Sequence, residues 1–161
     1  MRFVCNRPRR LRGFDYSSDN AYFVTVCTCK CRPLFDNLNG YNAVSMIIRT
    51  FCEAVNGFEG VELPAFVVMP NHVHAMIIIN TGKSDPGKTL SDILQSFKRY
   101  STVEYIKMVK SGELPPFDGK IWERSFYEHI IRDEADYKKH YDEIRSNPLS
   151  WESDRFFVRS K

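Results

Sequence analysis

Residues 61–80 have the sequence VELPAFVVMPNHVHAMIIIN. Its two halves, 61–69 and 73–80, are apolar and rich in β-branched side chains, and Pro70-Asn71 between them is a turn signal. This pattern predicts a β-hairpin in which most of both strands is buried, so the rest of the chain must cover it.

The second strand of this hairpin carries two histidines, His72 and His74. Because successive strand residues point to opposite faces, the histidines share one face with Met76 and Ile78, and the residues between them form the other face. We expect the second face to be the helix-packed core and the histidine face to be partly covered by a C-terminal helix. Two imidazoles placed two residues apart can converge on one divalent ion, although histidines that are simply satisfied or at the surface are the alternative for this pair alone.

Outside the hairpin, the chain shows three helical and two strand patterns. We expect strands at 22–29 and 121–131, and helices at 41–55, from Thr89 to about Gly112, and from Asp133-Glu134 to Pro148. The resulting order predicts an α+β fold: a ferredoxin-like split βαβ antiparallel sheet with two helices on one face and an added C-terminal helix.

The length of 161 residues predicts one domain over 1–161, with 1–20 as a basic N-terminal arm and 149–161 as a C-terminal tail. A hydrophobic content of 43% excludes disorder of the whole chain. No apolar run is long enough for a membrane span, and the N-terminus lacks a signal-peptide pattern, so we expect a cytoplasmic protein without a membrane partner.

Basic residues are concentrated at the start of the chain, although the net charge is only +3. Arginines precede the first acidic residue, and their planar donors suit phosphate groups; the candidates are Arg7, Arg9, Arg10 and Arg12. A merely solvated terminus is the alternative interpretation.

Three of the five cysteines form the pattern Cys27-x-Cys29-x-Cys31. On a strand they would lie about 6.6 Å apart on one face. Thiolates on one tetrahedral zinc lie only about 3.8 Å apart. We therefore predict reduced packing residues in place of a zinc site or disulfides.

The expected last helix presents two faces. Glu143 and Asn147 lie four residues apart with His140 one turn earlier, a polar face able to close a metal site. Tyr137, Tyr141 and Ile144 form the opposite stripe, which is typical of a core-facing surface.

Taken together, six segments resemble one known family over almost the whole chain. They are Arg12-Gly-Phe-Asp-Tyr16, 22–26, Val68-Met-Pro-Asn-His-Val-His74, Phe97-Lys-Arg-Tyr100, 121–129 and Asn147-Pro-Leu-Ser-Trp151. The sequence is similar to the single-tyrosine HUH transposases, and among these to the REP-associated, IS200-like transposases. The resemblance implies an enzyme of DNA transposition that nicks and rejoins single-stranded DNA beside a hairpin through a covalent phosphotyrosine. It further implies Mg²⁺ or Mn²⁺ held by His72, His74 and Asn147.

The sequence departs from this family at the nucleophile, because Glu143 stands one turn before Asn147, where the family has its tyrosine. Tyr141 is the nearest phenol, yet its direction on a regular helix is about 120° away from the metal face. Three interpretations stay open: Tyr141 as substitute nucleophile, metal-assisted hydrolysis with Glu143, or an inactive or repurposed DNA-binding module.

The predicted partner is single-stranded DNA with a hairpin, bound by a monomer or homodimer. The predicted DNA contacts are Lys98, Arg99 and the four arginines of the arm, with solubility as their alternative role. Phe97 and Tyr100 beside the two cations are either base-stacking or core residues. An RNA-binding ferredoxin-like protein fits less well, because the expected strands lack that class's aromatic base-stacking motif.

Overall fold

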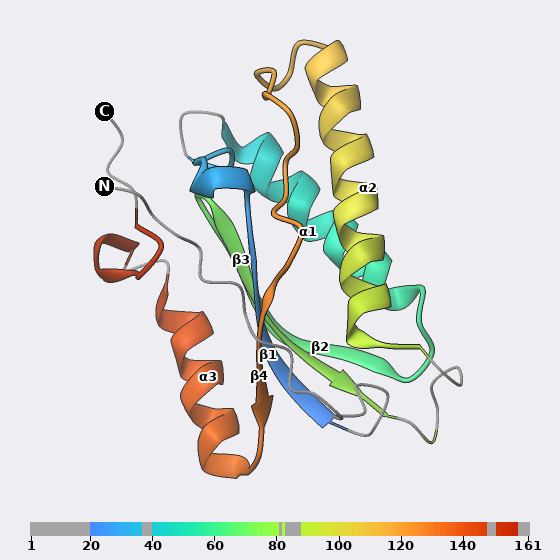
Figure 1. Ribbon diagram of the computed structural model, residues 1–161, viewed down its shortest axis with the longest axis vertical. Helices are drawn as coiled ribbons and strands as arrows, with labels where there is room; N and C mark the ends of the chain where they lie inside the picture. The colour runs from blue at the N-terminus through green and yellow to red at the C-terminus, as the bar shows by residue number, and fades with distance from the viewer. Residues whose placement is uncertain (1–19, 37–39, 81, 83–87, 148–150, 158–161) are drawn as a thin grey trace.

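Four antiparallel strands form one sheet in the order β2-β3-β1-β4. The strands are β1 (Asn20–Cys27), β2 (Val61–Met69), β3 (His72–Ile79) and β4 (Tyr127–Ile131). The computed structural model describes residues 20–36, 40–80, 82, 88–147 and 151–157 (Figure 1). The strand order, with a helix in each of the two crossovers, confirms the predicted ferredoxin-like α+β fold.

Three helices cover the two faces of this sheet: α1 (Gly40–Asn56), α2 (Leu90–Lys110) and α3 (Glu134–Ser146). Helices α1 and α2 lie on one side and α3 on the other (Figure 1). The residues of β3 that alternate with the histidines are all buried in the core beneath α1 and α2, as their parity predicted. None of the helices described is both long and apolar enough to cross a membrane.

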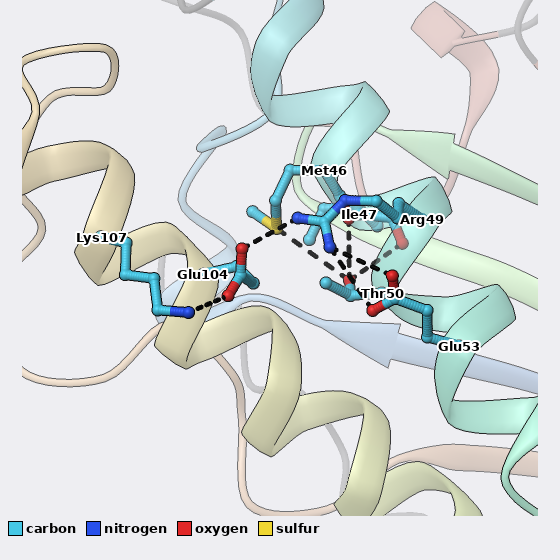
Figure 2. Close-up of polar contacts among 7 residues, drawn as sticks. All are labelled: Met46, Ile47, Arg49, Thr50, Glu53, Glu104 and Lys107. Atoms are coloured by element: carbon cyan, nitrogen blue, oxygen red, sulfur yellow. Dashed lines mark hydrogen bonds and ion pairs between the residues drawn. The ribbon is translucent and has the colours of Figure 1, made fainter.

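The contact between α1 and α2 combines buried aromatic rings with an exposed ion-pair network. The rings of Phe51 and Phe97 pack 4.4 Å apart in the core. At the surface, Arg49 donates to Glu104 at 2.9 Å and Lys107 donates to the same carboxylate at 2.6 Å, as Figure 2 shows. The hydrogen bonds from Lys107 and Arg49 lower the pKa of Glu104. Because exposed pairs contribute little, burial of the aromatic rings holds the two helices together.

Both later helices begin at the residues that the sequence indicated. The Thr89 side chain accepts from the Asp92 backbone N–H, and the Asp92 carboxylate accepts from Thr89, so α2 starts with a complete capping box. The Asp133 carboxylate accepts from the backbone N–H of Asp136 at the start of α3.

The structure corrects the first predicted strand, which ends at Cys27 and does not extend to Cys29. Cys29–Cys31 forms a 3₁₀ turn with positive φ at Lys30 and Cys31, so the three cysteines do not share a strand face. Cys27, Cys29 and Cys31 form no disulfide among the described residues, and Cys27 and Cys31 are buried against Phe156, which agrees with a packing role.

The fourth strand is also shorter than the predicted 121–131, since β4 covers only its last five residues. Trp122 makes one isolated bridge to Thr28, and its indole donates to Ser101 Oγ in the core. The Lys98 ammonium donates to the carbonyls of residues 123, 124 and 125. The side chains of Ile121 and Trp122 are therefore buried in a segment that makes only this one bridge, and the carbonyls of the polar residues 123–125 are paired with the Lys98 ammonium.

Candidate metal centre and nucleic-acid surface

His72 and His74 lie at the start of β3, a central strand between β1 and β2. Both side chains are buried, and their Nε2 atoms are 3.0 Å apart. Neighbouring ligands of an octahedral ion with bonds of about 2.1 Å lie about 3 Å apart. The two imidazoles therefore already have the spacing that one divalent ion requires.

Each imidazole is oriented by a partner at its other ring nitrogen. Asn71 Oδ1 lies 2.7 Å from His72 Nδ1, and Thr25 Oγ1 lies 2.7 Å from His74 Nδ1. The Asn71 amide nitrogen donates to the carbonyls of Cys31 and Phe156, which directs its oxygen to His72. His72 Nδ1 must then carry the proton, and its Nε2 keeps a lone pair for a ligand.

Burial, followed by the neighbouring His74, lowers the pKa of His72 to about 3. The ring is therefore neutral at physiological pH, as a metal ligand must be.

Asp154 is the third group at this position, and the sequence analysis did not select it. Its Oδ2 lies 3.7 Å from the Nε2 atoms of both His72 and His74, and its side chain is only 5% exposed. Although burial opposes ionisation, His74 and the backbone N–H of Phe156 hold the pKa of Asp154 below its ordinary value. Two imidazole nitrogens and a carboxylate oxygen thus converge within 4.8 Å of one another.

Asp154 reaches the histidines because the segment 151–157 folds back beyond the end of α3 (Figure 1). A 3₁₀ turn at Trp151–Ser153 directly precedes Asp154. After Asp154, the Phe156 ring packs against the His72 ring, with 4.9 Å between the ring centroids. The predicted tail 149–161 therefore contains, within its described part, residues that close the histidine site.

Asn147, the third predicted ligand, is the C-terminal cap of α3. Its side chain is buried, and its Nδ2 has no hydrogen-bond partner among the described residues. A buried amide without a partner is costly, so a polar group bound in this region would satisfy it. A metal-ligand role for Asn147 stays a prediction.

The other predicted residues of α3 point in two directions. Tyr141 packs with Tyr137, Phe23 and Met76 in an apolar cluster beneath α3, as its stripe predicted. Glu143 lies on the polar side, with Oε2 3.2 Å from His140 Nδ1. A nucleophilic role for Tyr141 and a catalytic role for Glu143 both stay predictions.

The predicted DNA contacts on α2 have different environments. The Lys98 ammonium donates to backbone carbonyls of the segment before β4, and the Phe97 side chain is fully buried. Arg99 is exposed and lies over the Tyr100 ring at 5.2 Å, and Tyr100 itself is 42% exposed. A hollow of about 490 Å³ adjoins them and is lined by Lys98, Arg99, Thr102, Val103, Ile106, Phe117, Gly119, Lys120, Ile121, Trp122, Glu123 and Arg124.

This surface offers cations beside an exposed aromatic ring, which is the combination that single-stranded nucleic acid binds. Lys120 and Arg124 were not selected from the sequence. Arg124 lies within the predicted strand 121–131, at a position that precedes β4 in the structure. The predicted arginines Arg7, Arg9, Arg10 and Arg12 lie outside the described residues.

Comparison with known families gives a match over most of the chain. Residues 17–143 match the family described as "Transposase IS200 like". Among curated relatives, an uncharacterised protein of Haemophilus influenzae is 30% identical over 94% of this chain and 93% of its own length. A putative REP-associated tyrosine transposase of the same organism is 26% identical over 84% of this chain and 73% of its own. The REP-associated tyrosine transposase of Escherichia coli is 28% identical over 55% of this chain and 44% of its own.

Two solved structures share the fold. A REP-associated tyrosine transposase bound to a REP hairpin superposes with a TM-score of 0.62 at 23% identity, covering 88% of this chain and 74% of that one. A putative transposase of Deinococcus radiodurans gives a TM-score of 0.50 at 18% identity, covering 84% and 95%. At these identities the likeness supports the architecture alone.

Proposed function

The chain belongs to the IS200-like transposase family, and from this membership we propose that it binds hairpin-containing single-stranded DNA and holds a divalent metal at His72 and His74. The similar solved structure holds a REP hairpin, which supports this class of partner. We further propose that it acts in the cytoplasm as a monomer or homodimer. A sizing column run with and without the oligonucleotide tests the assembly state.

The observation that carries the proposal is the convergence of His72, His74 and Asp154 at the start of β3. Two imidazoles and a carboxylate fit a divalent transition ion, and nitrogen ligands favour Mn²⁺ over Mg²⁺, which prefers oxygen. Asn147 at the end of α3 completes the predicted set through its side-chain oxygen, while its buried Nδ2 lacks an acceptor among the described residues.

A metal bound here supplies Lewis-acid polarisation of the scissile phosphate. Other residues of the chain orient the metal ligands, exclude water and bind the DNA backbone. Asn71 and Thr25 fix the imidazole rings, and the buried position of the pair excludes bulk water. Arg99 and the arm arginines supply charge for the DNA backbone in this proposal.

The nucleophile distinguishes three versions of the function. In the first, the Tyr141 oxygen forms a bond to phosphorus while the bond from phosphorus to a deoxyribose oxygen breaks, and the departing oxygen takes a proton. This version requires Tyr141 to leave its apolar cluster with Phe23 and Met76. The second version is metal-assisted hydrolysis with Glu143, and the third is a DNA-binding module without cleavage. Glu143 at the family's nucleophile position favours these two over the first.

The deciding experiment incubates a labelled single-stranded hairpin oligonucleotide with the protein and Mn²⁺, followed by a denaturing gel. A protein–DNA adduct that disappears in Tyr141→Phe supports the first version. Cleavage without an adduct, lost in Glu143→Gln, supports metal-assisted hydrolysis. Binding without either product supports the module, and Glu143→Tyr then tests whether the phenol alone is missing. Absence of hairpin binding in the wild type would contradict the proposed function itself.

Metal binding is tested separately by thermal unfolding with Mn²⁺. We expect stabilisation in the wild type and its loss in His72→Ala. No stabilisation in the wild type would exclude the metal part of the proposal and leave the histidines as packing residues.

A further inference from the structure

A second group of metal-ligating side chains converges where β4 meets α3. His129 comes from β4, and Asp136 and His140 come from α3. His129 Nε2 is 2.7 Å from Asp136 Oδ2, and His140 Nε2 is 3.3 Å from Asp136 Oδ1. Ligands of one tetrahedral zinc with bonds of about 2.0–2.1 Å lie about 3.3 Å apart. One ligand atom from each of the three side chains lies within 4.8 Å of the others, so the group is close enough to converge on one ion.

His140 is held in the orientation that a ligand needs. Its ring stacks on Phe23 at 4.5 Å between centroids and is only 9% exposed. Glu143 Oε2 lies 3.2 Å from the other ring nitrogen, Nδ1. A carboxylate that accepts from Nδ1–H leaves the lone pair on Nε2, which is the usual outer support of a metal-bound histidine. In this arrangement Glu143 orients the His140 ring and takes no part in nucleophilic chemistry.

The position is open to solvent on one side. The His129 side chain is 44% exposed, and a hollow of about 450 Å³ beside it is lined by His129, Arg132, Asp133, Ala135, Asp136 and Lys139. Water molecules can therefore complete the coordination of an ion. The positive charges of Arg132 and Lys139 weaken the binding of a cation here. The negative charges of Asp133, Asp136 and Glu143 strengthen it.

We propose that His129, Asp136 and His140 form a second divalent-metal site, suited to Zn²⁺, with Glu143 as the positioning residue of His140. Two imidazoles, one carboxylate and a water form a common zinc ligand set. The Phe23 ring contacts both sites, because it stacks on the His140 ring and also on the His74 ring, at 5.2 Å between centroids. An ion here links β4 to α3 and thereby fixes the helix that carries Tyr141 and Asn147.

The test counts bound Zn²⁺ on the whole protein, under reducing conditions, by equilibrium dialysis and metal analysis. We expect two equivalents in the wild type and one in His129→Gln, a change at an exposed residue whose folding is checked by circular dichroism. His72→Gln removes the other equivalent, so failure of the histidine pair on β3 and failure of this site give different results. Lys139→Gln, which lines the same hollow without offering a ligand, is expected to keep both equivalents.

Co²⁺ replaces Zn²⁺ as a spectroscopic probe of the ligands. We expect visible bands of nitrogen and oxygen ligation from both sites, without the intense near-ultraviolet band of thiolate ligation. His129→Gln is expected to remove the contribution of this site and His72→Gln that of the histidine pair on β3. Glu143→Ala is expected to weaken Zn²⁺ binding by about 10- to 100-fold, and Glu143→Gln to restore most of it, because its amide oxygen still accepts from Nδ1–H. Equal Zn²⁺ content in wild type, His129→Gln and Asp136→Asn would overturn the proposal and leave an ion pair only.

Discussion

Asp154 is the residue at which the proposed β3 metal centre is most directly tested, since it adds the only carboxylate in this group. At an Mn²⁺ concentration about 100 times the Kd, binding stabilises a folded protein by about 2.7 kcal/mol. We expect Asp154→Asn to raise the Mn²⁺ concentration needed for half of the wild-type stabilisation by about tenfold, since each 1.4 kcal/mol of lost ligand energy is a factor of ten. Thermal unfolding at several Mn²⁺ concentrations measures this shift.

Glu152→Gln is the matched control for Asp154, because Glu152 lies in the same segment and is exposed. It is expected to leave the Mn²⁺ dependence unchanged. An unchanged dependence in Asp154→Asn as well would remove Asp154 from the ligand set.

Side-chain parity made the histidine pair predictable, whereas Asp154 had no comparable signal. His72 and His74 stand two apart in an apolar strand, so the alternation of strand faces was enough to place them together. Asp154 follows a three-residue 3₁₀ turn, where no periodicity of hydrophobic residues exists to reveal its direction. Its approach depends on tertiary contacts, chiefly the hydrogen bond from Asn71 to the Phe156 carbonyl.

Tyr105 offers a test of core energetics that is independent of both sites. Its ring is fully buried beside Phe117, and its hydroxyl has no hydrogen-bond partner among the described residues. Removing an unpaired buried hydroxyl relieves a desolvation cost, so Tyr105→Phe is expected to be neutral or to stabilise the protein by up to about 1 kcal/mol. Urea unfolding at neutral pH measures the difference, and a loss of more than 1 kcal/mol would reveal a missing partner.

The same residue predicts a pH dependence. Burial raises the pKa of Tyr105 above its ordinary value of 10. Because the unfolded chain then releases the proton first, the stabilising contribution is complete below pH 10 and is lost as pH rises above it. Tyr105→Phe is expected to have a flatter loss of stability in this alkaline range than the wild type.

At the scale of elements, Lys98 and Arg99 are adjacent on α2 but are expected to respond differently to substitution. The Lys98 ammonium donates to three carbonyls before β4, at 2.8, 3.3 and 3.1 Å. Hydrogen bonds to a charged group each contribute about 1.5–3 kcal/mol. We expect Lys98→Met to lower the free energy of unfolding by at least about 1.5 kcal/mol in urea.

Arg99→Gln is the companion variant and is expected to keep wild-type stability while weakening binding to single-stranded DNA. Fluorescence anisotropy with a labelled hairpin oligonucleotide measures the affinity. If both variants unfolded alike and bound DNA alike, the distinction between a structural cation and a DNA contact on α2 would be wrong.

Helices and the hairpin were predictable because their hydrophobic periodicity continues over many residues. The capping residues Thr89 and Asp133 also located two helix starts correctly. The strand prediction was wrong for residues 121–126. Trp122 and Phe126 are buried like strand residues, but the backbone of this segment makes only an isolated bridge, from Trp122 to Thr28, before β4 begins at Tyr127. Local composition does not distinguish these two ways of burying a side chain.

At the scale of the whole molecule, one face of the sheet contains the main apolar core and the other contains the proposed metal sites. The face beneath α1 and α2 contains the continuous apolar core. The opposite face contains the smaller clusters beneath α3 and segment 151–157, interrupted by the histidines. Stability therefore rests on one face, and the polar groups of the proposed sites are on the other, where substitutions affect fewer core contacts.

The distribution of charge over the molecule gives the last prediction, which concerns the arm. Each phosphate contact on a single strand contributes about 0.7 to the slope of the logarithm of affinity against the logarithm of salt concentration. If all four arm arginines contact phosphates, replacing Arg7, Arg9, Arg10 and Arg12 by glutamine reduces this slope by about 2.8. Anisotropy titrations from low to moderate salt measure the slope, with the net charge reduced equally in a control that replaces four exposed lysines, Lys107, Lys110, Lys138 and Lys139. A slope that stays unchanged in the arm variant, or falls as much in the control, would show that the arm arginines serve solubility and do not bind DNA.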